Sequence, residues 1–209
     1  MFVKSYCSSI SGIEAVTVAV EVNITAGIGM YLVGLPDNAV RESQERIRAA
    51  FENCEYKMSG KKVVVNLSPA DLRKEGSAYD LPIAVAMLAA SGQIDAAPLS
   101  RYVLLGELSL DGSILPVKGA LPIAMQALKE GFAGIILPEE NAREAAVVKG
   151  LDVYGIGNLR EVVNFLQGFT NLTPARINLD ETFTEAQRSF DGDFCDVKGQ
   201  AQVKRALEV

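Results

Sequence analysis

The chain has 209 residues and a formal net charge of −6, and 49% of its residues are hydrophobic, as in an ordinary globular protein. The acidic balance gives no general attraction to nucleic acid, and no apolar run is long enough to span a bilayer. The complete absence of histidine excludes Ser-His-Asp and Cys-His catalytic systems and histidine-bound zinc.

The N-terminal residues lack the apolar core of a signal peptide, so we expect a cytoplasmic protein. The three cysteines, Cys7, Cys54 and Cys195, are scattered and form no C-x-x-C pair. We therefore expect reduced thiols and no metal site.

Residues 2–33 are predicted to form strands, because Val16–Val22 is rich in β-branched residues and Met30–Val33 is a second apolar run. The glycines around these runs do not have the G-x-G-x-x-G spacing of a dinucleotide-binding loop. We expect them to lie in a loop.

A helix is predicted after Asp37, whose carboxylate is expected to cap it by accepting bonds from the first free amides. Apolar and small residues recur at helical spacing and predict one buried stripe: Val40, Ser43, Ile47, Ala50, Phe51 and Cys54. Charges of both signs are interleaved on the opposite face, which is predicted to be solvated: Arg41, Glu42, Glu45, Arg46, Arg48 and Glu52.

A short buried strand is predicted at Lys62–Leu67, and it leads into the polar loop Ser68–Ser77. Asp80 is predicted to cap the next helix, Leu81–Ala90, which is apolar on all sides and therefore expected to be central. A helix N-terminus after such a loop attracts anions. The polar residues available there are Asp71, Lys74 and Ser77. They are either site residues or ordinary turn and cap residues, and we favour the second interpretation.

The stretch Leu104–Gly119 predicts a β-hairpin that leads into a helix. Asp111-Gly112 is the signal of a two-residue turn in which both positions need positive φ. Gly106-Glu107 interrupts the first strand, and a glycine inside a strand usually marks a bulge or a close backbone approach.

Strands and helices alternate from Lys62 onward, which predicts an α/β (α+β) sandwich with helices packed on a sheet. The later elements are a helix that starts at Ala120 and ends with Gly131 as its C-cap, a strand at Gly134–Leu137, a helix opened by Pro138-Glu139-Glu140, a strand at Val153–Ile156 and a helix at Leu159–Leu166.

The character of the sequence changes at Phe169, where a polar and weakly periodic segment begins. A new helix is predicted at Ala201–Val209, and the chain ends inside it, so we expect a piece of a longer protein. We divide the chain into a domain at 1–168, a linker at 169–195 and a truncated first helix of a further module at 196–209.

Three stretches taken together resemble known families. Gly106–Pro138, which contains GELSLDGSILPVKGALP, is similar to the proteolytic domain of Lon proteases, a member of the ribosomal protein S5 domain 2-like superfamily. Val33–Phe51 and Asn66–Gly92 resemble more specifically the ComM/YifB family of magnesium-chelatase-like AAA+ ATPases, and Asp196–Val209 is similar to the first helix of its ATPase module. The motif residues are Asp71, Lys74, Glu75, Gly76, Gly106 and Glu107.

The Lon resemblance implies a Ser-Lys dyad in which the lysine activates the serine. Laid against the Lon pattern through LPVKGALP, the lysine position is occupied by Leu121, and the serine position falls at Ser77 or Ala78. Lys118 and Lys74 are candidates for a relocated base, but the spacing recommends neither. We therefore expect no catalytic residues, with Ser77 at most a vestigial nucleophile.

The ComM/YifB resemblance implies a hexameric, ATP-driven motor that acts on DNA in branch migration during transformation and recombination. It also implies ATP and Mg²⁺ as cofactors of the full-length protein, but the G-x-x-x-x-G-K-[ST] loop that cradles phosphates is missing from these residues. We expect no cofactor here, and as partners the protein's own C-terminal AAA+ module, other copies in a homo-hexamer and possible DNA, but no membrane.

Three functions compete. The leading hypothesis is a non-catalytic accessory domain that helps to assemble a ring or to guide DNA through it. The alternative is a Lon-like, serine-dependent peptidase domain, either active or vestigial. Magnesium insertion ranks lowest, because the sequence has no cluster of metal ligands and no signature of a porphyrin pocket.

Overall fold

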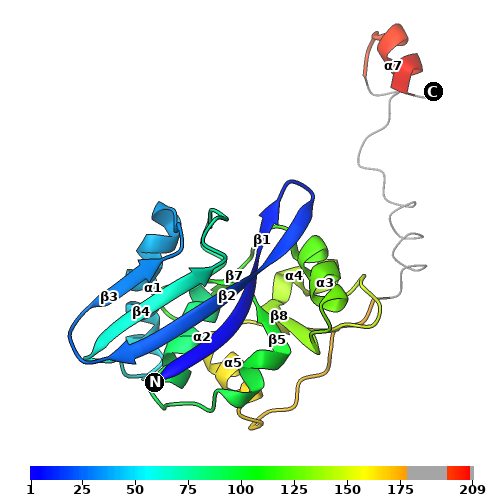
Figure 1. Ribbon diagram of the computed structural model, residues 1–209. Coiled ribbons are helices and arrows are strands. Elements are labelled where there is room, and N and C mark those ends of the chain that lie inside the picture. The colour runs from blue at the N-terminus through cyan, green and yellow to red at the C-terminus, as the bar shows by residue number, and fades with distance from the viewer. Residues whose placement is uncertain (178–196, 208–209) are drawn as a thin grey trace. The chain divides into compact units, whose positions relative to one another are not determined.

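The computed structural model describes residues 1–177 and 197–207, which belong to two compact units divided after Arg176 (Figure 1). In the second unit the structure describes the helix α7, Ala201–Leu207, which confirms the start of the helix predicted there. Most of the predicted linker, together with Cys195, Asp196 and the predicted end of the last helix, lies outside the described residues.

A mixed seven-stranded sheet runs through the first unit in the order β3-β4-β2-β1-β5-β8-β9 (Figure 1). Its strands are β1 Phe2–Ser11, β2 Glu14–Thr25, β3 Met30–Val33, β4 Lys62–Ser68, β5 Tyr102–Leu104, β8 Gly134–Pro138 and β9 Asp152–Ile156. β2 is antiparallel to β1 and β4, with Tyr6 opposite Ala19 and Val22 opposite Val65, and every other neighbouring pair is parallel. The predicted mixture of strands and helices is confirmed.

Helices connect the strands, and several of them pack against the sheet. They are α1 Asn38–Asn53, α2 Asp80–Ala90, the 3-10 turn η1 Ala97–Arg101, α3 Ala120–Lys129, α4 Glu139–Ala145 and α5 Leu159–Leu166. α2 lies against β1 and β2, α3 against β2 and β8, and α4 against β8 and β9. Among the helices of the described residues, none has both the length and the apolar character that crossing a bilayer requires.

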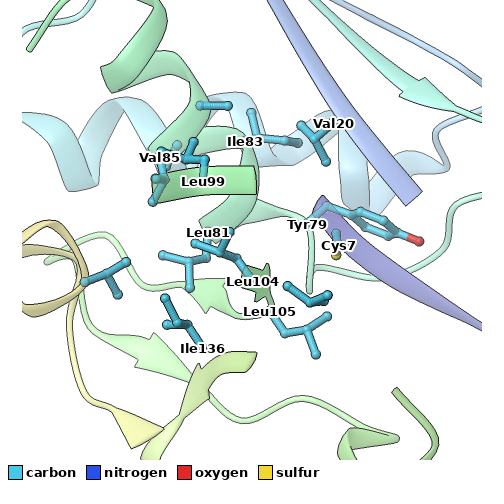
Figure 2. Close-up of a cluster of buried hydrophobic side chains, with 14 of the residues drawn as sticks. Cys7, Val20, Tyr79, Leu81, Ile83, Val85, Leu99, Leu104, Leu105 and Ile136 are labelled. Carbon is cyan, nitrogen blue, oxygen red and sulfur yellow. The ribbon is translucent and has the colours of Figure 1, made fainter. Parts of the chain in front are cut away.

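The centre of the core is α2, in which all 11 residues are buried. Figure 2 shows Leu81, Ile83 and Val85 of this helix among the side chains of Leu104 and Ile136. A helix that is apolar on every side is stable only where all of its faces are buried, and the sequence predicted this central position.

The hairpin pairs β6, Glu107–Leu108, with β7, Ile114–Leu115, but its turn differs from the prediction. The Ser109 amide bonds to the Ser113 carbonyl at 2.9 Å, and the Gly112 amide bonds to the Ser109 carbonyl at 3.0 Å. The loop therefore has three residues, a type I turn followed by a left-handed glycine, and only Gly112 of the predicted pair has positive φ, at +89°. The Asp111 carboxylate accepts the Ser113 amide at 2.9 Å, which stabilises this longer turn.

The first unit extends beyond the boundary that the sequence predicted at Gly168. Leu172 and Ala175 pack against the core, and the Ala175 amide donates to the Val153 carbonyl of β9 at 2.8 Å. Arg176 then pairs with Asp152 at 2.9 Å. Residues 172–176 therefore cover the outer edge of β9.

Candidate functional site

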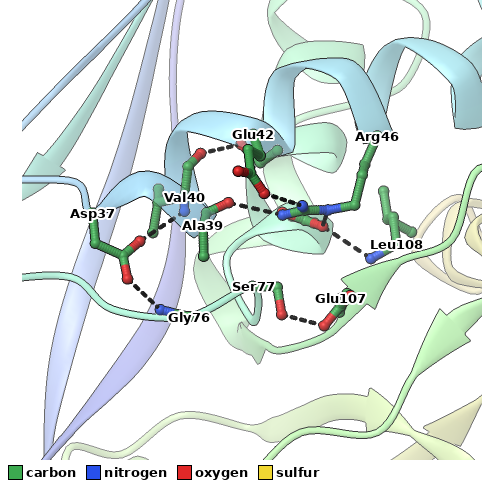
Figure 3. A network of polar contacts seen from close by, with 11 residues as sticks. Asp37, Ala39, Val40, Glu42, Arg46, Gly76, Ser77, Glu107 and Leu108 are labelled. Atoms are coloured by element: carbon green, nitrogen blue, oxygen red, sulfur yellow. Dashed lines mark hydrogen bonds and ion pairs between the residues drawn. The ribbon is translucent and has the colours of Figure 1, made fainter.

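The polar loop before α2 is fixed to the start of α1 by Asp37. One oxygen of its carboxylate accepts the Val40 amide at 2.8 Å, which confirms the predicted N-cap. The other oxygen accepts the Gly76 amide at 3.1 Å (Figure 3), and the Asp37 amide donates to the Lys74 carbonyl at 3.0 Å. A single capping residue therefore sets the position of the loop that carries Ser77.

The Lys74 side chain is hydrogen-bonded to the backbone of its own loop. It is fully buried, and its amine donates to the carbonyl of Pro69. Burial lowers the pKa of Lys74, and the exposed carboxylate of Asp71 opposes that shift. Of the two lysines considered as a relocated base, Lys74 therefore has its amine hydrogen-bonded within its own loop.

Asp80 does not cap α2, because it is buried and its carboxylate makes no capping bond to that helix. The carboxylate instead accepts Nε of Arg46 at 2.6 Å and Nη2 of Arg46 at 3.0 Å, and the Leu108 amide donates to it at 3.1 Å. Arg46 also donates to the Ala39 carbonyl at 2.9 Å. The prediction that Arg46 lies on a solvated face was wrong, since its side chain is only 19% exposed.

The electrostatics of this pair reflect its burial. Desolvation raises the pKa of Asp80, and the bonds from Arg46 and from the Leu108 amide counteract that shift. The bond to Asp80 in turn raises the pKa of Arg46. The pair joins α1, the start of α2 and β6 into one unit.

For Gly106 the sequence predicted either a bulge or a close backbone approach, and the structure shows a close approach. Its amide donates to the Ala78 carbonyl at 3.1 Å, and its carbonyl accepts the Leu81 amide at 3.0 Å. A Cβ atom at Gly106 would lie 2.5 Å from Cγ2 of Ile114, so a larger residue does not fit without a shift. This contact places Glu107 beside Ser77.

A cleft of about 710 Å³ opens at this point. The Ser77 hydroxyl donates to the Glu107 carboxylate, as Figure 3 shows. The other polar residues that line the cleft are Ser8, Ser9, Ser11, Arg73, Glu75 and Lys118. The structure therefore brings together six residues that the sequence singled out: Glu75, Gly76, Ser77, Ala78, Glu107 and Lys118.

Other predicted residues lie elsewhere. Leu121 is in the first turn of α3, its amide donates to Glu144 at 3.0 Å, and it is not among the described residues that line the cleft. Within the described parts of the chain, no lysine amine is hydrogen-bonded to Ser77. Those parts also contain no group of three or more acidic or cysteine side chains placed to hold a metal ion.

One wall of the cleft has only a weak signature in the sequence. Ser8, Ser9 and Ser11 come from the end of β1, and their signal in the sequence is a run of serines within the strand that Ile10 interrupts. The Ser8 hydroxyl donates to the Val16 carbonyl at 3.0 Å, which supports the strand pair as well as lining the cleft.

The comparison with protein families decides the relationship of the chain. The family model described as "Subunit ChlI of Mg-chelatase" matches residues 20–141, more than half of the sequence. The chain belongs to this ChlI family.

Relatives of the ChlI-family chain match it almost from end to end. It is 39% identical over 207 residues to the uncharacterized protein Rv2897c of Mycobacterium tuberculosis, with 99% of this chain and 40% of the relative covered. It is 39% identical over 209 residues to the competence protein ComM of Haemophilus influenzae, covering 98% and 40%. YifB of Escherichia coli, also described as uncharacterized, is 40% identical over 199 residues, covering 95% and 38%. The expected ComM/YifB relationship is confirmed.

A more distant similarity links the chain to a peptidase. It is 28% identical over 161 residues to the Lon protease of Brevibacillus choshinensis, which covers 70% of this chain and 20% of that protein. The chain spans about 40% of the length of the ComM/YifB relatives it matches.

Proposed function

We propose that this chain is a non-catalytic accessory domain of a ComM/YifB-type, magnesium-chelatase-like AAA+ ATPase, in which it helps to assemble a hexameric ring or to guide DNA. The full-length protein would then be an ATP-driven motor for DNA branch migration in recombination and transformation. The match to relatives more than twice as long supports further modules, and the name of the Haemophilus relative supports a role in competence.

The observation that carries the non-catalytic role is the hydrocarbon at the position of the Lon lysine. The alignment with the Lon pattern puts Leu121 at that position, and the Ser77 hydroxyl bonds to a carboxylate instead of an amine. A serine hydroxyl is a weak nucleophile unless a neighbouring group takes its proton. The similarity to Lon also supports our proposal that the first unit has the S5 domain 2-like fold.

ATP and Mg²⁺ do not fit the residues of this chain. A phosphate loop needs backbone amides followed by a lysine and a hydroxyl in the pattern G-x-x-x-x-G-K-[ST], and the 209 residues do not contain it. We propose that the longer protein binds the nucleotide outside these residues.

Deletion within the full-length protein tests the accessory role. Removal of residues 1–176, the compact first unit, is expected to weaken hexamer formation, DNA binding or both, measured by sedimentation and by DNA retardation. The matched control is full-length Ser77→Ala, which is expected to assemble and bind as the parent does. Unchanged assembly and DNA binding after the deletion would refute the proposal.

A serine-dependent peptidase is the second candidate, and the Ser77–Glu107 pair beside Lys118 favours it. In that reaction the Ser77 oxygen would attack a peptide carbonyl while its proton passes to Glu107, which would then protonate the leaving amine. The test is cleavage of unfolded casein by the parent chain, Ser77→Ala and Glu107→Gln. Cleavage by the parent that both variants lose would establish the peptidase, and no cleavage by the parent would eliminate it.

A further inference from the structure

The two edge strands of the seven-stranded sheet differ in whether another segment of the chain is hydrogen-bonded to them. At β9, the segment 172–176 covers the edge, with the Ala175 amide bonded to the Val153 carbonyl at 2.8 Å. At the other end, β3 pairs with β4 from Met30 opposite Val63 to Val33 opposite Asn66 (Figure 1). Within the compact unit Met1–Arg176, no segment is hydrogen-bonded to the outer edge of β3.

The chemistry of this open edge is unusual. From Ile28 to Leu35 the sequence is IGMYLVGL, with no charged residue and no proline. Natural proteins commonly protect an exposed edge strand with charges, proline or a bulge, because its free amides and carbonyls can pair with another strand. We call Ile28–Leu35 the β3 edge.

The apolar side chains of the β3 edge divide between two environments. Met30 and Leu32 pack partly against the core, and Tyr31 and Val33, which alternate with them, are 51% and 45% exposed. Ile28 is 84% exposed. The exposed side chains therefore form a largely apolar stripe next to unpaired backbone groups, with the Lys62 amine over the Tyr31 ring at 5.0 Å from its centroid.

Leu35 extends this stripe at a conformational cost. Its φ is +55°, a left-handed value that a bulky side chain rarely adopts, and its side chain is 56% exposed. The Lys74 amide holds it there by donating to the Leu35 carbonyl at 3.2 Å. Strained residues that persist often belong to binding surfaces, so Leu35 points to the same edge independently of the strand.

We propose that the β3 edge docks a second copy of this chain, with the two β3 strands antiparallel across a two-fold axis. Such a pair is self-complementary, since each strand offers the amides and carbonyls that the other lacks. A two-fold axis perpendicular to the sheet keeps its faces in register, so the Tyr31 and Val33 side chains of both copies meet on one face.

Two observations favour a second copy over other occupants. The β3 edge carries no charged residue, so two copies of it can pair without placing like charges opposite one another. Addition of β3 to the β9 edge of a neighbour would have to displace residues 172–176, which are bonded to Val153 and Asp152 of β9. A four-residue strand pair buries less surface than a standard interface, so we expect a dissociation constant above about 1 μM.

Sedimentation of the 209-residue chain from about 5 μM to about 1 mM tests the proposal. The parent is expected to dimerise as the concentration rises, and Val33→Lys is expected to weaken dimerisation at least about tenfold by placing like charges across the axis. The matched control is Ile13→Lys, which changes an apolar side chain that is 93% exposed between β1 and β2. It is expected to leave dimerisation unchanged, and far-UV dichroism checks that both variants fold.

Hydrogen exchange at Met30–Val33 adds a readout that a merely structural role would not change. Protection of these amides that rises with concentration supports the dimer. A parent chain that stays monomeric to about 1 mM, or a Val33→Lys chain that dimerises as well as the parent, overturns the proposal. Protection in the monomer that disappears when residues 177–209 are removed also overturns it, because the chain's own C-terminal segment would then be the occupant.

Discussion

Two carboxylates occupy neighbouring positions in the structure and serve different purposes. Asp80 is buried and bonded to Arg46 and to the Leu108 amide, whereas Glu107, one residue before Leu108, borders the cleft and accepts the Ser77 hydroxyl. Ser77 and Asp80 come from one segment and Glu107 and Leu108 from another, and Arg46 of α1 adds a third segment to the buried pair. The buried Arg46–Asp80 pair therefore fixes these segments in place, and the Ser77–Glu107 pair lines the cleft.

This difference teaches how the protein keeps an open polar site in place. Charge removed from water is costly unless it is fully bonded, so the Arg46–Asp80 pair tolerates little rearrangement. The Ser77–Glu107 pair lies at the cleft surface, where water can replace either partner. Substitutions in the Arg46–Asp80 pair should consequently change mainly the stability of the fold, and substitutions in the Ser77–Glu107 pair should change mainly binding in the cleft.

The largest effect is expected from Asp80→Asn, which leaves the Arg46 guanidinium with only the exposed carboxylate of Glu42, 3.8 Å away, as an ion-pair partner. We expect the free energy of unfolding to fall by about 3–5 kcal/mol, measured by urea denaturation. Glu107→Gln is the matched change in the cleft pair. Equal losses in the two variants would show that the comparison between the pairs is wrong.

A smaller loss is expected from Gly106→Ala, which tests the contact that joins the two segments. The added methyl group would meet Ile114 at 2.5 Å, and overpacking of this kind costs about 1–3 kcal/mol. Gly76→Ala is not a suitable control, because Gly76 has a φ of +84°. Gly60→Ala is, since a methyl group there meets nothing within 4 Å and its φ is not positive, and it should unfold like the parent.

The pH dependence of the free energy of unfolding should reveal the buried thiol of Cys7. Burial raises the pKa of Cys7 to about 12, from an ordinary value of 9.0. Between these values the unfolded chain releases the proton and the folded chain keeps it, so this contribution to stability is complete below pH 9 and is lost as pH rises toward 12. The slope is about 1.4 kcal/mol per pH unit, and Cys7→Ala should reduce it by that amount in denaturation at several alkaline pH values. The same slope in parent and variant would contradict this assignment.

The smallest change is expected from Ser77→Ala. Its hydroxyl is bonded at the cleft surface, so we expect the free energy of unfolding to change by no more than about 0.5–1 kcal/mol. Thermal denaturation of parent and variant provides the measurement. A loss as large as that of Asp80→Asn would mean that the Ser77–Glu107 pair is part of the structural framework.

Much of the fold could be predicted from local patterns. The Asp37 cap, the buried helix α2 and the extent of α5 follow from spacing and composition, because these features depend on nearby residues. For Gly106 the sequence left a bulge or a close approach open, and the structure has the second of these.

Most of the incorrect or missing predictions concern contacts between residues that are far apart in the sequence. The helical pattern of α1 placed Arg46 among solvated charges, and only the fold brings the buried Asp80 to it. The hairpin signal Asp111-Gly112 was correct in place but not in length, because a side-chain bond to Ser113 favoured a three-residue loop. The serines at the end of β1 could not be connected with Ser77, which lies far along the chain.

The short segment from Leu172 to Arg176 has a practical consequence for anyone who shortens this protein. A fragment that stops at Gly168, where the composition changes, would lose the Ala175 bond to Val153 and the Arg176 contact with Asp152. Such a fragment should precipitate during expression, whereas one that ends at Arg176 should remain in solution. A peptide of the missing residues, supplied separately, should restore the solubility of the shorter fragment.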